Sequence, residues 1–248
     1  MMFNKRYIIC VGLMAFISAQ LCMAETGPPF LTDDPQPVQF RHWEYYVSSM
    51  GTFQKKTWSG TLPHFEVNYG IIKNVQVHLL LPVNYNYIKH EGAKFGYADT
   101  EFGIKYCFVQ ETENRPQVGI FPIVQIPTVE NNEFGNGEAQ FFLPVWLQKS
   151  WKKLTTYGGV GYQLNPGKGN RNFLFTGYEI QYDFSPVITL GGELYYHTPD
   201  ESQGKPVFAF NVGGYLNMSS KTHILFSLGQ SFTNQSFISS YIGFLWTI

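Results

Sequence analysis

From Arg41 to the end of the chain, apolar and polar side chains alternate at every second position, and short polar segments interrupt the alternation. A period of two is typical of β-strands, whose successive side chains point to opposite faces of a sheet. Residues 236–248 show the pattern well, because Tyr241 and Gly243 lie on one face and larger apolar residues on the other. This apolar face consists of Ile242, Phe244, Trp246 and Ile248. The repeated pattern predicts an all-β structure.

Twelve such strands can be placed, and the segments between them alternate in length. Segments after even-numbered strands are mostly short, whereas those after odd-numbered strands are mostly longer and polar. Bacterial outer-membrane barrels have this asymmetry, with short periplasmic turns and longer extracellular loops. We therefore predict a transmembrane antiparallel β-barrel of about 12 strands over residues 41–248. The predicted strands are 41–53, 60–71, 75–85, 97–110, 117–128, 138–149, 154–164, 172–184, 187–198, 207–218, 222–232 and 236–247.

The two faces of these strands differ in polarity, and the composition fits a barrel in lipid. Charged residues make up only 14% of the chain, against roughly 25% in soluble domains. Because a Lys or Arg facing lipid near the midplane costs about 2–4 kcal/mol, we assign the charged face to the lumen. Leu62, Leu80, Phe121, Ile123, Phe173 and Phe175 share that face. The lumenal candidates are His42, Glu44, His64, Glu66, Glu101, Lys105, Glu138, Phe142, Trp146, Glu179, Glu193, Tyr195 and His197.

Residues 1–24 have the pattern of a secretory signal peptide. A basic stretch at Asn4-Lys5-Arg6 precedes an apolar run over residues 7–17, and Cys22-Met23-Ala24 forms a cleavage site. The apolar run is too short for a membrane span, which needs about 20 apolar residues. We therefore expect an exported protein.

Residues 25–40 form a separate, proline-rich segment on the periplasmic side. Four prolines in this short stretch exclude both a ladder strand and a helix interior. Two interpretations stay open: a tail outside the barrel, or a plug that enters the lumen. The plug candidates are Phe30, Leu31, Asp33 and Asp34.

The same segment carries a resemblance to a known family. Residues 27–35 (GPPFLTDDP) and 41–44 (RHWE) resemble bacterial outer-membrane proteins described as transporters of the meta-pathway of phenol degradation. The resemblance implies an outer-membrane β-barrel that passes aromatic or other hydrophobic small molecules. The terminal Ile248 departs from the aromatic residue with which outer-membrane barrels usually end.

The predicted lumen favours a narrow, partly filled channel. Twelve strands enclose a lumen of intermediate width, between a side-chain-filled barrel of eight strands and an open porin. Its mixture of charges and aromatic rings suits small hydrophobic or aromatic solutes, which can stack on the rings as they lose water. We therefore predict a channel of the outer membrane of a Gram-negative bacterium, with no enzymatic activity.

Other functions follow less directly from the residues. His42/Glu44, His64/Glu66 and Glu193/His197 could supply metal ligands, but a solvated network of lumenal charges explains them as well, so we predict no metal and no cofactor. A phospholipase-like barrel enzyme needs a Ser and a His that face lipid, and a structural or adhesive barrel is the remaining alternative.

The net charge of −1 gives no basic face for nucleic acid. The expected partners are outer-membrane lipid, lipopolysaccharide, the outer-membrane insertion machinery and a small hydrophobic solute, and the expected state is a monomer.

Overall fold

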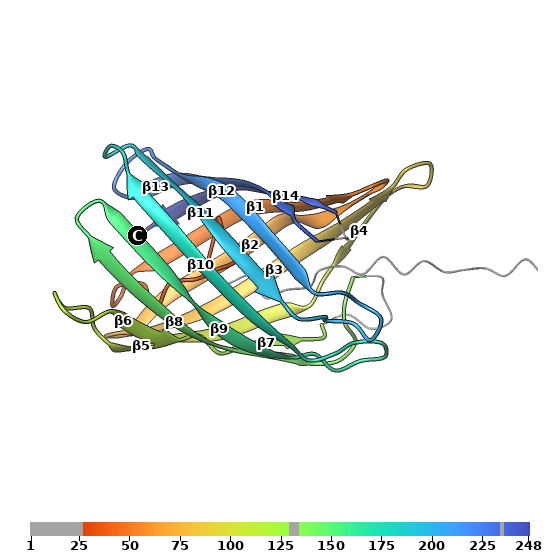
Figure 1. The fold of residues 1–248 in the computed structure, drawn as a ribbon, viewed down its shortest axis with the longest axis horizontal. Helices are drawn as coiled ribbons and strands as arrows, with labels where there is room; N and C mark the ends of the chain where they lie inside the picture. The colour runs from red at the N-terminus through yellow and green to blue at the C-terminus, as the bar shows by residue number, and fades with distance from the viewer. Residues whose placement is uncertain (1–26, 129–133, 234–235) are drawn as a thin grey trace, which may run out of the picture.

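The computed structural model describes residues 27–128, 134–233 and 236–248, so the predicted signal peptide lies outside the described part. These residues form fourteen β-segments (Figure 1). No helix in the described ranges is long and apolar enough to cross a membrane. The segments are β1 (Trp43–Gln54), β2 (Thr57–Ile72), β3 (Val75–Ile88), β4 (Gly92–Tyr97), β5 (Thr100–Val109), β6 (Gln117–Ile120), β7 (Ile123–Ile126), β8 (Gln140–Trp151), β9 (Leu154–Leu164), β10 (Phe173–Asp183), β11 (Ile188–His197), β12 (Val207–Asn217), β13 (Thr222–Ser231) and β14 (Ile238–Thr247).

The segments form one closed antiparallel barrel of twelve strands, which confirms the predicted fold. β4 and β5 both pair with β3 and together make one strand. β6 and β7 make another strand, because both lie between β5 and β8. The barrel closes where β1 pairs with β14, from Glu44↔Thr247 to Phe53↔Ile238. No sheet edge is left unpaired at this seam, as a lipid environment requires.

The first two hairpins extend further than the sequence pattern predicted. Residues 54–59 and 86–96 were predicted as loops, but most of them continue the ladders of β1–β2 and β3–β4. The β1–β2 turn contains only Lys55 and Lys56, and positive φ angles at Lys55 and His90 allow both chain reversals. Cross-strand contacts such as that between Phe53 and Trp58 support the ladder here. The β3–β4 hairpin reaches beyond the neighbouring strands (Figure 1).

Leu62 was predicted to face the lumen, and this prediction is wrong. Its side chain is 51% exposed on the outside of the barrel. The pairing of β2 with β3 shifts register between Thr61 and His64, and the pairing with β1 shifts at the same level. An irregularity in the ladder changes which residues face inward beyond it, and sequence alternation alone does not reveal its position.

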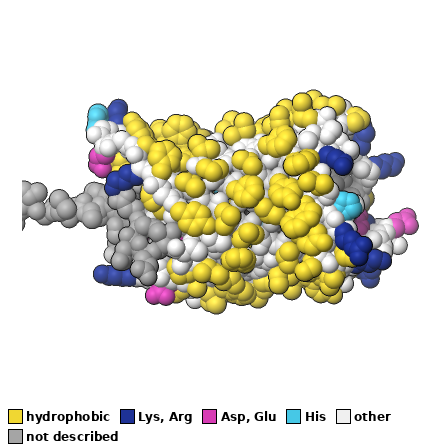
Figure 2. Space-filling model, turned by 180° about the vertical axis from the view of Figure 1, so that it is seen from behind, with side chains coloured by type: hydrophobic (Ala, Val, Ile, Leu, Met, Phe, Trp, Pro, Cys, Tyr) yellow, Lys and Arg dark blue, Asp and Glu magenta, His cyan; other side chains and the backbone are white. Residues whose placement is uncertain are grey.

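The outside of the barrel is a belt of apolar side chains (Figure 2). On β14, Ile242, Phe244 and Trp246 are exposed, whereas Tyr241 and Leu245 are buried, so the closing strand has the predicted facing. In the view of Figure 2, charged side chains gather at the two ends of the barrel. This distribution matches a lipid-spanning barrel, in which an apolar band lies between two polar rims.

A charge placed on this belt is expected to destabilise the barrel according to its depth. Val212, 55% exposed, lies midway along β12, whereas Val187, 52% exposed, lies in the turn before β11. Val212→Arg should cost about 2–4 kcal/mol of folding free energy and Val187→Arg only about 0–1 kcal/mol. Urea titration of the protein folded in lipid vesicles measures both. Equal costs at the two positions would contradict the proposed position of the belt in lipid.

Candidate functional site

The proline-rich N-terminal segment (residues 27–40) lies inside the barrel. Because its prolines prevent a ladder, its backbone groups bond to inward-facing side chains instead. The Tyr215 hydroxyl donates to the carbonyl of Pro28 at 3.1 Å, and the Ser227 hydroxyl donates to that of Pro29 at 2.6 Å. At the other end of the segment, Phe40 forms a parallel bridge with Gly70 just before β1 begins. The segment therefore runs from inside the lumen to the end of the barrel at which β1 begins.

Glu193 on β11 is the main polar anchor of this segment. Its two carboxylate oxygens accept the amides of Leu31 and Thr32, at 2.9 and 2.8 Å. The side-chain amide of Asn211 donates a third hydrogen bond at 2.5 Å. The Glu193 residue is only 2% exposed. Three N–H donors compensate for burying this carboxylate, which fixes the backbone of the segment at one place on the wall.

An ion pair forms the second anchor. Lys105 Nζ on β5 lies 2.9 Å from Asp33 Oδ1, and both side chains are buried. Asp34, at 3.9 Å, is a weaker second partner. Burial raises the pKa of the Asp33 carboxyl, whereas the Lys105 ammonium acts in the opposite direction by favouring the carboxylate. Removing either partner would leave the other charge buried without a counter-charge, which is strongly unfavourable.

Aromatic side chains fill the lumen on the side of β8 to β11. Phe175 lies at their centre, with its ring centroid 6.2 Å from that of Trp146, 6.4 Å from that of Phe142 and 6.1 Å from that of Tyr195. Leu31 of the N-terminal segment packs against this cluster. Rings at these separations stabilise one another through edge and stacking contacts. This half of the lumen is therefore a packed wall.

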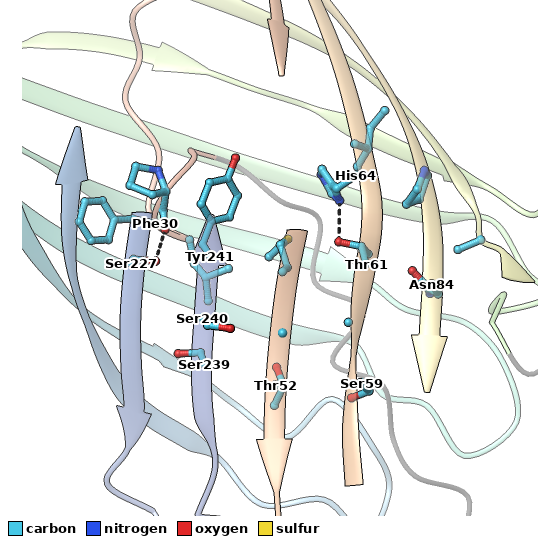
Figure 3. A pocket seen from close by; sticks show the side chains of 18 of the residues that line it. Phe30, Thr52, Ser59, Thr61, His64, Asn84, Ser227, Ser239, Ser240 and Tyr241 are labelled. Carbon is cyan, nitrogen blue, oxygen red and sulfur yellow. Dashed lines mark hydrogen bonds between the residues drawn. The ribbon is translucent and has the colours of Figure 1, made fainter. Parts of the chain in front are cut away.

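The opposite side of the lumen contains a cavity of about 150 Å³. Pairing between strands places Thr52 of β1 beside Ser239 of β14 and Ser59 of β2, and these small side chains leave the space (Figure 3). Phe30 and Leu31 line the cavity from the N-terminal segment. The β1 residues that line the cavity belong to the C-terminal half of that strand, so the cavity lies between the N-terminal segment and the end of the barrel that carries the β1–β2 turn.

The remaining lining combines apolar and polar groups. Leu80, Tyr195 and Phe237 contribute apolar surface, whereas Asp99 and Glu101 contribute carboxylates. Glu101 Oε1 accepts a hydrogen bond from the side-chain amide of Gln125 at 2.6 Å. The cavity thus joins an apolar surface with hydrogen-bonding groups, as small-molecule sites do.

The structure places most of the sequence-predicted site residues in the interior. Two of them lie outside it: His42 and Glu138 are exposed and precede β1 and β8. Glu44 is half-buried and accepts a hydrogen bond from the Tyr46 hydroxyl at 3.1 Å. Of the plug candidates, Phe30 and Asp33 are buried and Leu31 and Asp34 are half-buried. The buried lumenal candidates are His64, Glu66, Glu101, Lys105, Phe142, Trp146, Glu179, Glu193, Tyr195 and His197.

Two pairs of buried ionisable groups lie in the described lumen: Lys105 with Asp33, and His78 with Glu66. His78 Nδ1 lies 3.4 Å from Glu66 Oε1, and Asn68 donates to the same carboxylate at 2.6 Å. Within the described ranges, no three His, Cys, Asp or Glu side chains are grouped as ligands of one metal ion. His64, His78 and His197 are buried inside the barrel, away from the lipid-facing wall that a phospholipase-like site would use.

Sequence reasoning missed the small side chains that create the cavity. Thr52, Ser59 and Ser239 were not among the lumenal candidates, which were charged or aromatic residues. A signal was present in Gly51-Thr52, Ser59-Gly60-Thr61 and Ser239-Ser240, three runs of small residues in strands that are otherwise aromatic-rich. Only the pairing of β14, β1 and β2 brings the three runs together.

Comparison with known proteins identifies the fold. No family model matches the sequence, and no curated protein matches it. Among solved structures, the COG4313 outer membrane channel from Pseudomonas putida F1 is similar, with a TM-score of 0.69 and 14% identity over 87% of this chain and 98% of that chain. The NanC porin (TM-score 0.58, 11% identity, 82% and 98%) and the CymD monoaromatic hydrocarbon channel (0.53, 10%, 85% and 89%) are also similar.

These similarities are in fold, and the fold is that of outer-membrane barrels. A closed barrel that satisfies its backbone within the wall and carries an apolar belt is suited to lipid. The fold and the belt together place this chain in the outer membrane.

Proposed function

We propose that this protein is an outer-membrane channel for small hydrophobic or aromatic compounds, with the N-terminal segment as a plug. The cavity beside Phe30 is the observation that carries the proposal. Its volume of about 150 Å³ equals that of an engineered cavity that holds benzene, so one aromatic ring fits. One chain closes the barrel by pairing β1 with β14, so a monomer is sufficient. CymD, whose structure is similar, is a monoaromatic hydrocarbon channel, and this supports the same class of solute.

Passage needs two steps in this arrangement. A ring first enters the cavity from the extracellular side and rests against the apolar side chains of Phe30 and Leu31. It continues only when the N-terminal segment moves, because this segment fills the lumen between Glu193 and Lys105. The polar anchors would then determine the free energy of opening, whereas the cavity would determine which solutes bind.

Filling the cavity tests this proposal. Thr52→Trp places a large side chain between Ser59 and Ser239, and overpacking an occupied site costs about 1–3 kcal/mol, which corresponds to roughly ten-fold in affinity. We expect uptake of radiolabelled benzyl alcohol to fall by about that factor. The measurement uses Gram-negative cells with intact lipopolysaccharide that carry the protein in the outer membrane.

Thr57→Trp is the matched control, since Thr57 lies at the tip of the same hairpin and outside the cavity lining. It should leave uptake unchanged. Two results would refute the proposed function of the cavity. One is uptake by cells with the unchanged chain that is no faster than uptake by cells without the protein. The other is equal uptake by cells with Thr52→Trp and cells with the unchanged chain.

A further inference from the structure

We infer that the cavity selects solutes by charge: it takes neutral or cationic single-ring compounds with an O–H or N–H donor and rejects ring carboxylates. The inference rests on the proposed function and deepens it. Asp99 and Glu101 line the cavity together with Phe30, and no Lys or Arg is among the described residues that line it. A solute carboxylate in this space would face two carboxylates, and the described lining offers it no Lys or Arg.

The nearest cation along the same strand is already paired. Lys105 follows Glu101 on the inward face of β5, but its ammonium lies 2.9 Å from Asp33 and does not line the cavity. The plug therefore removes a positive charge from the solute's surroundings as well as filling space. Both cavity carboxylates also accept N–H donors: Asp99 from the amide of Asn136 at 2.7 Å, and Glu101 from Gln125.

Asp99 has one acceptor oxygen that a solute can satisfy. The residue is only 4% exposed, and its Oδ2 is occupied by the Asn136 amide, whereas Oδ1 has no hydrogen-bond partner in the described part of the chain. A buried acceptor without a donor is unfavourable, and a ligand that supplies the donor removes that cost. A phenolic or alcoholic O–H, or an ammonium, can supply it after a small movement of the lining, because Oδ1 has almost no accessible surface in this structure. A carboxylate has no donor to offer.

Binding of three isosteric probes tests the inference. The folded protein in a non-ionic detergent is titrated with 4-fluorobenzyl alcohol, 4-fluorobenzylamine and 4-fluorobenzoate, followed by ¹⁹F NMR. We expect the alcohol and the amine to bind at least about ten-fold more tightly than the carboxylate, because like charges at short range repel strongly in a partly buried site. Thr52→Trp should abolish binding of all three, which separates the cavity from the detergent micelle.

Neutral variants assign the selectivity to the two carboxylates. In the double variant Asp99→Asn with Glu101→Gln, the preference for the alcohol over the carboxylate should fall to less than about three-fold, and the amine should lose affinity, because the like charges are gone. Glu138→Gln removes an exposed carboxylate outside the cavity and should change nothing. The single variants Asp99→Asn and Glu101→Gln provide the same readout if the double variant does not fold.

The outcomes separate this inference from the proposed function. Equal affinity for the three probes in the unchanged protein, or selectivity that survives in the neutral variants, overturns the charge rule and leaves the cavity as a binding site for aromatic rings. Failure of all three probes to bind the unchanged protein overturns both.

Discussion

Deletion of residues 27–38 is expected to convert a closed lumen into a conducting one. The deleted stretch includes Phe30, which lines the cavity, and the partners of the anchors Glu193 and Lys105. Without it, the buried polar side chains on the wall can be hydrated, and a twelve-stranded barrel keeps space for a narrow aqueous path. Single-channel conductance in planar bilayers should rise at least about ten-fold over that of the full chain, since a lumen of intermediate width is then unfilled.

The deletion keeps Phe40, whose bridge with Gly70 leads into β1, so the barrel should still fold. A heat-dependent shift in gel mobility checks folding. Gln39→Ala changes an exposed side chain within the segment and serves as the control, with conductance expected to match that of the full chain. A folded deletion protein with unchanged conductance would show that the segment does not limit the pore.

The barrel could be predicted because its physical constraints are local. A strand between lipid and lumen must alternate in polarity, and this gave the facing of Tyr241 and Ile242 and the bounds of β9 without a structure. The irregularity at Leu62 and the extended β1–β2 hairpin could not be found in this way. Both depend on how β2 pairs with β1 and β3, and the register of a ladder is set by contacts between distant segments.

The site was less accessible to sequence reasoning for the same reason. Glu193 and Lys105 were identified as inward-facing, but nothing in the pattern of β5 or β11 indicates that they bind the chain's own Asp33, Leu31 and Thr32. A plug and a tail have the same proline-rich composition, because prolines exclude regular structure in both cases. The difference lies in whether the wall supplies donors and acceptors for the segment, which is a three-dimensional property.

Lys105→Met is expected to release the N-terminal segment while the barrel stays folded. The substitution keeps an unbranched side chain against Phe121 but removes the cation from the Asp33 carboxylate, and breaking a buried pair costs about 3–5 kcal/mol. Because the backbone ladder of the barrel is unaffected, that cost should appear as undocking of the segment. A cysteine introduced by Leu31→Cys reports undocking through its rate of modification by a maleimide, with Cys107 buried and unreactive in the background.

Restoring charge balance should restore docking. In the double variant Lys105→Met with Asp33→Asn no unpaired charge is buried, so the Leu31→Cys reporter should again be protected, because replacing both members of a buried pair is far less costly than removing one. Lys149→Met is the matched control: its pair with Glu111 is as short, at 3.0 Å, but more exposed and lies away from the segment. Loss of such a pair costs about 0–1 kcal/mol and should not change protection. If Lys105→Met leaves the reporter as protected as in the unchanged chain, the ion pair does not hold the plug, and docking rests on Glu193 and the packing of Leu31 against the aromatic wall.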